Sequence, residues 1–206
     1  MWKTIFGKKK PLNEMEKIAS DFHSGKYPVY PILKPGNWPG IKAGAIKQTL
    51  VGSPDNPEVV LGYGYDTPEN FIFLTHQHMQ TLNSKEVVDN ANANLKNYKA
   101  QLTYSEKLDK QVLFGSGEDF SSEKILVREY MQQAHKMLDA EEVIVSIPRR
   151  RCMMVVNRDN KQLIKTFLDL HLRAWHEDDY GNAPITKLLF ILKDGDIQGT
   201  YDLDVK

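Results

Sequence analysis

The chain has 206 residues, of which 41% are hydrophobic and 26% are charged. This balance is typical of a globular protein and excludes a disordered or fibrous one. The 27 basic and 27 acidic residues give a formal net charge of zero. Because a general affinity for nucleic acid or for an anionic membrane normally requires a basic excess, we expect no nucleic-acid binding. No run approaches the roughly 18 apolar residues of a spanning helix, so we also expect no membrane span.

The N-terminal residues and the cysteine content bear on location. The single cysteine, Cys152, cannot form a disulfide within the chain, which fits a reducing compartment and predicts a cytoplasmic protein. Residues 1–10, MWKTIFGKKK, place their lysines after the apolar residues and therefore do not resemble a secretory signal. Because three apolar side chains and three lysines bind a membrane only weakly, we interpret them as a frayed or partner-docked terminus.

The N-terminal half is predicted to contain a helix, a proline-rich arm and a small sheet. Asn13 and Glu16 have the spacing of a capping box and predict a helix that ends at Gly25. Residues 27–40 hold four prolines among aromatic residues, so we expect an extended, ordered arm and neither a helix nor a central strand. Three runs separated by turn formers predict an antiparallel meander, at residues 45–51, 59–65 and 71–75.

The middle of the chain predicts two helices with a short strand between them. Ser84 is expected to cap a helix that continues to about Tyr98. A short strand is expected at residues 111–114, and a second helix is expected to begin near Ser121 or Ser122.

The C-terminal part predicts two hairpins and a helix. Apolar, β-branched runs at residues 143–147 and 152–156 predict neighbouring antiparallel strands, joined by Pro148 and three arginines. Asn160 is expected to cap the next helix, and Asp194-Gly195 is the strongest hairpin signal in the chain. Hairpins separated by helices, without strict strand-helix alternation, predict an α+β fold with a mixed, mainly antiparallel sheet and helices packed on one face.

The domain organisation follows from the same pattern. We expect a single α+β domain over residues 1–206, with the proline-rich arm at 27–40. The glycine-rich stretch at 115–120 is the best place for a subdivision into two halves, and the alternative is a loop within one domain.

Three short stretches together resemble a known family. They are ANANL at residues 91–95, the Asp-Ala-Glu at 139–141 and the run VSIPRRR before an apolar strand. They resemble the YtpQ-like family of uncharacterised bacterial proteins over about residues 70–200. In that family an A-x-x-N-L helix accompanies a strand that ends in Pro, a variable residue and Arg-Asp. Pro148 and Arg150 match this pattern, whereas Arg151 stands where an acid is expected. The resemblance implies a bacterial protein and no particular activity.

The arginine run is the strongest functional signal in the sequence. Arg149, Arg150 and Arg151 are adjacent and repel one another, so we expect them to bind an acidic protein partner or a small anionic ligand. Two alternatives are a solvated hairpin tip and an internal pairing with the acidic residues 177–179. As members of a solvent-facing tip, the three arginines are expected to change stability by no more than about 1 kcal/mol.

A second candidate site consists of His76 and His78. On a strand, two residues two positions apart face the same way and could ligate a metal ion. A metal-dependent hydrolase for a phosphate-containing substrate, with the arginines on the phosphate, is therefore the alternative function. Because two histidines do not complete a metal site and no other ligand has a diagnostic spacing, we expect no cofactor.

No catalytic residue is predicted. Ser146 lacks the small flanking residues of a nucleophile elbow, and Ser116 precedes no phosphate-binding strand-to-helix turn. The leading prediction is therefore a cytoplasmic binding or adaptor protein that uses its arginine-rich tip, with the oligomeric state left open.

Overall fold

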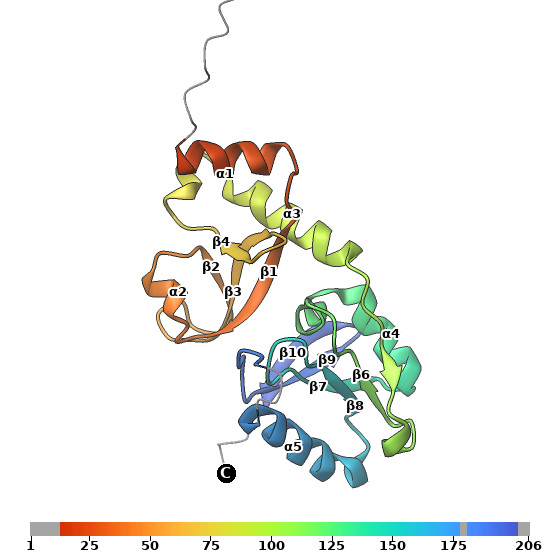
Figure 1. The fold of residues 1–206 in the computed structure, drawn as a ribbon. Helices are drawn as coiled ribbons and strands as arrows, with labels where there is room; N and C mark the ends of the chain where they lie inside the picture. The colour runs from red at the N-terminus through yellow and green to blue at the C-terminus, as the bar shows by residue number, and fades with distance from the viewer. Residues whose placement is uncertain (1–12, 178–180, 202–206) are drawn as a thin grey trace, which may run out of the picture.

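The chain forms two lobes (Figure 1). The computed structural model describes residues 13–177 and 181–201. Residues 1–10, for which a frayed or partner-docked terminus is predicted, lie outside this range. The N-terminal lobe contains α1 (Glu14–His23), β1 (Val29–Pro35), α2 (Pro39–Lys42), β2 (Lys47–Gly52), β3 (Pro57–Asp66), β4 (Phe71–Phe73), the 3₁₀ helix η1 (His78–Gln80) and α3 (Ser84–Asn97). The C-terminal lobe contains β5 (Thr103–Tyr104), η2 (Glu106–Leu108), β6 (Val112–Phe114), η3 (Ser122–Leu126), α4 (Arg128–Leu138), β7 (Glu142–Ser146), β8 (Met154–Asn157), α5 (Lys161–His176), β9 (Leu189–Lys193) and β10 (Asp196–Tyr201).

The three strands predicted at residues 45–51, 59–65 and 71–75 are present in the N-terminal lobe, but they do not form a meander, because β2 and β4 pair with the same edge of β3 and β1 occupies the other edge. β3 pairs antiparallel with β1, β2 and β4. Residues 29–35 of the predicted arm are extended and form the edge strand β1. The expectation of no helix is wrong for Pro39 and Gly40, which begin the short helix α2, because proline is tolerated at the first position of a helix. Helix α1 begins with the predicted capping box of Asn13 and Glu16. It covers one face of the sheet, where the Tyr65 hydroxyl donates to the Ile18 carbonyl at 2.9 Å.

On the opposite face of this sheet, β3 contributes the glycines Gly62 and Gly64. In antiparallel pairs, directly opposed residues project to the same side, so Tyr30 and Phe73 share the face of Gly64, their common partner. A methyl group added at Gly64 would lie 2.4 Å from the Ile72 carbonyl oxygen, and one at Gly62 would lie 3.1 Å from the Trp38 ring. Glycine therefore lets aromatic side chains lie flat across β3. We call this surface the glycine face.

The outer edge of β1 is closed to further strands. Pro31 and Pro35 lack an N–H group, and they alternate with Leu33, whose N–H donates to a carboxylate oxygen of Glu123 at 3.0 Å. The Asn94 amide from α3 donates to the Val29 carbonyl at 3.0 Å. Prolines and side-chain partners thus satisfy the edge that would otherwise accept another strand.

The C-terminal lobe has a six-stranded sheet in the order β10-β9-β7-β8-β6-β5, and all its strand pairs are antiparallel. The predicted pairing of the two β-branched runs is confirmed, with Val145 opposite Val155. The hairpin around Asp194-Gly195 is also confirmed. These elements confirm the α+β class.

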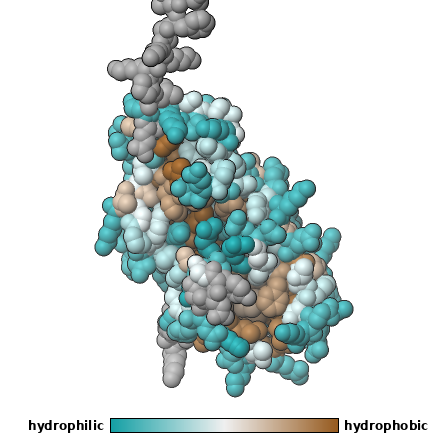
Figure 2. Space-filling model, viewed as in Figure 1, coloured by the Kyte–Doolittle hydropathy of each residue, from teal (hydrophilic) through white to brown (hydrophobic). Residues whose placement is uncertain are grey.

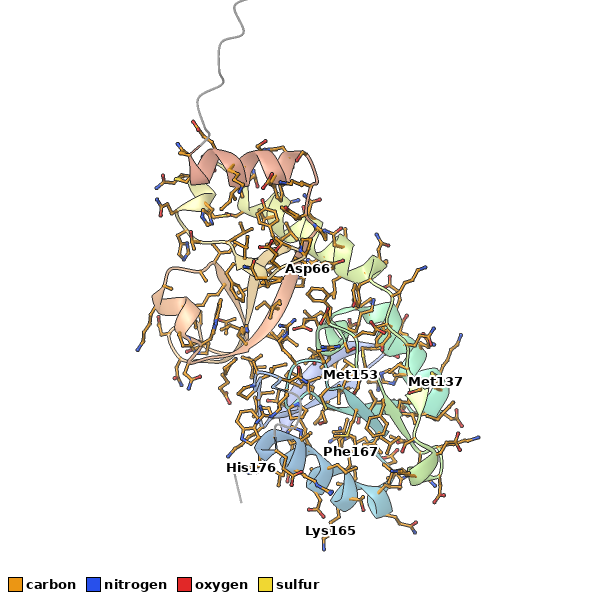
Figure 3. The ribbon with its side chains drawn as sticks, viewed as in Figure 1. Asp66, Met137, Met153, Lys165, Phe167 and His176 are labelled. Atoms are coloured by element: carbon orange, nitrogen blue, oxygen red, sulfur yellow. The ribbon has the colours of Figure 1, made fainter. Side chains whose placement is uncertain are left out.

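The arrangement of helices differs from the prediction of one covered face. Val145 and Val155 pack into the core on the side of α4, whereas Ile144 and Val156 pack against α5 on the other side. Phe167 points from α5 to the sheet and is fully buried there (Figure 3). Runs such as VIV and MVV lack polar alternation because both faces of these central strands are covered.

Two helix starts also differ from their predictions. Helix α3 is capped by Asn83, one residue before the predicted Ser84. The Asn83 side chain accepts a hydrogen bond from the Lys85 N–H at 2.9 Å. The single helix expected from Ser121 or Ser122 is divided into η3 and α4 by Val127, whose backbone is extended. The buried η3 segment contacts the other lobe, where Glu123 accepts from the Leu33 N–H and Lys124 donates to the Leu95 carbonyl. The helix expected at Asn160 begins there as predicted.

The lobes share one continuous cluster of buried hydrophobic residues, which includes Leu61 of the first sheet and Val145 of the second. The chain passes from one lobe to the other between α3 and β5, ahead of the 115–120 stretch.

Hydrophilic side chains cover most of the face shown in Figure 2. Among the described residues, no helix has the length and apolar character needed to cross a membrane. The prediction of a single domain stays a prediction.

Candidate functional site

The arginines lie in the connection between β7 and β8, residues 147–153, which we call the arginine segment. Its backbone bonds to residues 183–185. The Ser122 hydroxyl donates to the Arg149 carbonyl at 3.0 Å and so fixes the segment to η3. Arg151 has a left-handed backbone with φ of 62°. Because the segment turns sharply between fixed points, its three guanidiniums lie in different surroundings.

Arg149 is bound to the end of helix α5. Its guanidinium donates to the carbonyls of Ala174 at 2.8 Å, Trp175 at 2.7 Å and Asn182 at 2.6 Å. A cation at a helix C-terminus also complements the helix dipole. The expectation of a bare, solvent-facing tip is therefore wrong for Arg149, which ties the arginine segment to α5. Of the acids considered as its partners, Glu177 pairs with Arg173 at 3.5 Å, and Asp178 and Asp179 lie outside the described residues.

Arg151 is exposed and bound to the loop that precedes η3. Its guanidinium donates to the Gly117 carbonyl through Nε at 3.0 Å and through a second nitrogen, and it pairs with Asp119 at 3.6 Å. A cavity of about 570 Å³ lies beside it. The cavity is lined by Ser116, Gly117, Arg151, Cys152 and Asn182. Burial raises the pKa of the Cys152 thiol, which does not favour a reactive thiolate.

Arg150 faces the junction between the lobes. Its Nε atom is buried and has no hydrogen-bond partner, and the described residues offer its guanidinium no ion pair. Its charge nevertheless acts on Lys34, Asp66 and Glu123, whose pKa values it lowers. Of the three arginines, Arg150 is thus the one whose guanidinium makes no hydrogen bond to another described residue.

Glu123 is the buried acid of the junction and comes from η3. Its side chain is fully buried, with Oε1 accepting from the Leu33 N–H and Oε2 without a hydrogen-bond partner among the described residues. Burial raises the pKa of Glu123 to about 7, against the opposing effects of the Leu33 N–H and the Arg150 charge. Its neighbour Lys124 is also buried, and donates to the Leu95 carbonyl at 2.9 Å.

Lys34 completes the cationic side of the junction. It lies on the glycine face, with Nζ 5.7 Å from the Trp38 ring centre and 5.4 Å from that of Phe73. Burial lowers the pKa of Lys34, and Arg150 lowers it further. Two partly buried cations therefore lie near each other with aromatic rings beside one of them.

Asp66 and Asp119 supply negative charge nearby. Asp66 lies in the N-terminal lobe on the side of the junction (Figure 3). Burial raises the pKa of Asp66, and the negative charge of Asp119 raises it further. Next to them Tyr30 stacks on Phe120, with ring centres 4.0 Å apart, and joins the glycine face to the second lobe. We call Lys34, Asp66, Asp119, Glu123 and Arg150 the lobe-junction cluster.

His76 and His78 do not lie on a strand as predicted. Both follow β4, His76 in a turn and His78 at the start of η1. His78 Nδ1 accepts from the Thr75 N–H at 3.1 Å, whereas His76 is exposed. Both belong to the N-terminal lobe, whereas the arginine segment belongs to the other. No group of three metal-ligating side chains occurs within residues 13–177 and 181–201.

One serine–histidine pair forms that the sequence did not predict. The Ser146 hydroxyl and His171 Nδ1 are 2.8 Å apart, and His171 Nε2 is 3.0 Å from the Lys187 carbonyl. The carbonyl must accept from Nε2–H, so Nδ1 accepts from Ser146 and no acidic group orients the ring. Both side chains have 0% exposure. The pair therefore satisfies buried polar groups and is not accessible to a substrate.

Sequence reasoning identified Arg150 but missed Lys34 and Glu123. Lys34 lies in a proline-rich stretch and Glu123 near a predicted helix start, where charged residues are ordinarily solvated. The signal that was available for Lys34 was its place among aromatic residues in an edge strand.

Comparison with known proteins adds no relative. No protein-family model, characterised protein or solved structure matches the chain. Membership of the YtpQ-like family, and the bacterial origin that it implies, therefore stay proposals.

Proposed function

We propose that the chain is a non-enzymatic binding protein that holds an anionic group at the lobe junction, through Arg150 and Lys34. The group belongs either to a small ligand or to an acidic partner protein. We further propose that it acts in the cytoplasm, on the basis of its single cysteine.

One observation carries the proposal. Among the lysines and arginines of residues 13–177 and 181–201 that are partly buried, Arg150 and Lys34 are the two without a hydrogen bond or ion pair. Partial burial of two neighbouring cations is unfavourable unless a negative charge compensates it. The acid that acts on both of them, Glu123, has a pKa raised by burial to about 7, so at pH 7 it carries its charge in only about half of the molecules. A bound carboxylate or sulfate-like group would supply the missing charge and accept hydrogen bonds from both.

The other arginines support the choice of Arg150. Arg149 donates to three carbonyls and Arg151 to a fourth, so both have fewer donors to offer. The overall neutrality of the chain also favours a local anion site over a general polyanion-binding surface.

The hydrolase alternative has weaker support. It requires His76 and His78 to share a site with the arginine segment, yet they lie in different lobes. His78 also already uses Nδ1 as an acceptor.

The test is a titration at constant ionic strength, with sodium sulfate as the free anion and a short polyglutamate peptide as the acidic-partner probe. Arg150→Gln and Lys34→Gln should each weaken binding of the effective probe by about tenfold or more, because each removes a partly desolvated charge-assisted contact. Arg158→Gln is the matched control, since Arg158 is exposed and pairs with Glu142 at 2.6 Å away from the junction. Binding of sulfate indicates a small ligand, and binding of the peptide alone indicates a protein partner. The proposal fails if neither probe binds, or if Arg158→Gln weakens binding as much as Arg150→Gln.

A further inference from the structure

Glu123 has an environment that a purely structural carboxylate does not need. Oε1 is satisfied by the Leu33 N–H, but Oε2 is shielded from solvent and has no hydrogen-bond partner among the described residues. The Nε atom of Arg150 is buried and unpartnered at the same junction. An acceptor and a donor of opposite charge therefore lie in one buried cluster without being hydrogen-bonded to each other. Such an arrangement is stable only if the carboxyl group can be neutral or the cation can turn to another partner.

The charged groups around Glu123 come from several elements. Lys34 from β1 and Arg150 from the arginine segment act on it directly and favour its ionised form. Lys124, its neighbour in η3, points to α3 and donates to the carbonyls of Leu95 and Lys96.

The remaining charged groups act on the neighbours of Glu123 and not on Glu123 itself. The charge of Arg150 also lowers the pKa of Asp66 from β3, and the charge of Asp119 from the loop before η3 raises it. From α4, Glu129 acts on Lys124 and pairs with Lys96 at the surface. Within the described residues, the two cations that face Glu123 are therefore the two that we assign to the anion.

We propose that a bound anion and the ionised carboxylate of Glu123 compete for Arg150 and Lys34, so that binding of the anion drives uptake of a proton from solvent by Glu123. This inference rests on the proposed anion-binding function and adds its regulation.

The competition follows from the charges. When Glu123 is ionised, its negative charge already compensates the two cations and repels an incoming anion. When it is protonated, Lys34 loses the charge of its acidic neighbour and Arg150 keeps only that of Asp66, so an anion that reaches both cations can replace the Glu123 carboxylate. Thermodynamic linkage then requires that a bound anion raises the pKa of Glu123.

The direction of the pH dependence can be worked out. Burial holds the pKa of Glu123 at about 7 in the free protein. Above this pH most molecules are ionised at Glu123 and bind the anion weakly, and below it most are protonated and bind it tightly. The coupling therefore operates across neutral pH, where an ordinary glutamate is ionised throughout.

The first experiment measures sulfate affinity from pH 5.5 to 8.5, because sulfate keeps its charge over this range whereas phosphate does not. The wild-type protein should bind sulfate at least about fivefold more tightly at the acidic end, within the range typical of coupled sites. Glu123→Gln keeps an oxygen that can accept from the Leu33 N–H but cannot ionise, and its affinity should be nearly independent of pH. Calorimetry in buffers of different ionisation heat should show proton uptake near pH 7.5 in the wild type and none in Glu123→Gln.

A second measurement needs no variant and so is independent of the folding of Glu123→Gln. Carbon NMR of the glutamate carboxyl groups in the wild-type protein follows the titration of Glu123, and its midpoint should move to higher pH when sulfate is added. An unmoved midpoint, or pH dependence retained in Glu123→Gln, would overturn the coupling while leaving the anion site in place. If neither sulfate nor the polyglutamate peptide binds at any pH, or if Arg150→Gln leaves binding unchanged, the proposed function is instead overturned.

Discussion

Replacing Arg149 by alanine should destabilise the protein far more than replacing either of its neighbours. The guanidinium makes three hydrogen bonds to carbonyls, two at the end of α5 and one at Asn182. A hydrogen bond to a charged group contributes about 1.5–3 kcal/mol. The three contributions are not additive, because the carbonyls are partly exposed and can turn to water. We therefore expect a loss of about 2–4 kcal/mol, or roughly 5–15 °C in Tm for a chain of this size.

The assay is urea unfolding followed by circular dichroism, with Arg150→Ala and Arg151→Ala as matched variants from the same segment. Arg151→Ala should cost less than about 1 kcal/mol, because Arg151 is exposed and its ion pair is long. Arg150→Ala should be neutral or slightly stabilising, because it removes a partly buried cation that has no partner in the described part of the chain. A loss below about 1 kcal/mol for Arg149→Ala, or equal losses in all three variants, would refute the assignment of Arg149 to the helix end.

Two further predictions concern the second lobe. Phe167→Ala should lower the free energy of unfolding by about 3–5 kcal/mol in a urea titration, because the ring is fully buried between α5 and the sheet. A decrease of less than about 1 kcal/mol would mean that α5 does not cover this face. Burial lowers the pKa of His171 from 6.5 to about 4, so the unfolded chain binds a proton at a higher pH than the folded one. The contribution of His171 to stability is therefore fully present above about pH 6.5 and should fall by up to about 3 kcal/mol between pH 6.5 and 4, while the raised pKa of Glu123 acts in the opposite direction over much of the same range. The difference in unfolding free energy between the wild type and His171→Gln isolates this contribution and should decrease as the pH falls from 6.5 to 4, and a difference independent of pH would contradict the assignment.

Local sequence determined the elements whose signals involve neighbouring residues. The capping box of Asn13 and Glu16 and the Asp194-Gly195 turn formed as predicted, because their hydrogen bonds and backbone angles are set within a few residues. The paired strands around Pro148 also followed from composition, since apolar β-branched runs favour adjacent strands. The absence of polar alternation in those runs was a readable sign that helices cover both faces, and the prediction of one covered face overlooked it.

The contacts of each arginine were decided by tertiary structure. Three adjacent residues predicted one shared cationic tip, yet Arg149 is bound at the end of α5, Arg151 at Gly117, and Arg150 faces the other lobe. Adjacent side chains diverge when the backbone turns sharply, and the turn is held by distant partners. Sequence could therefore identify the arginine run but could not say which member is available to a ligand.

The lobe-junction cluster could not be predicted from sequence, because its members come from separate elements. Lys34 and Glu123 are 89 positions apart and meet because β1 is an edge strand whose free N–H requires an acceptor. Length, composition and short-range patterns determined the α+β class and most of the helices and strands. Only the packing of the two lobes decided that Glu123 is buried and that Arg150 and Lys34 share one junction. The physical reason is that burial and electrostatic pairing depend on distances in space, which a linear pattern does not contain.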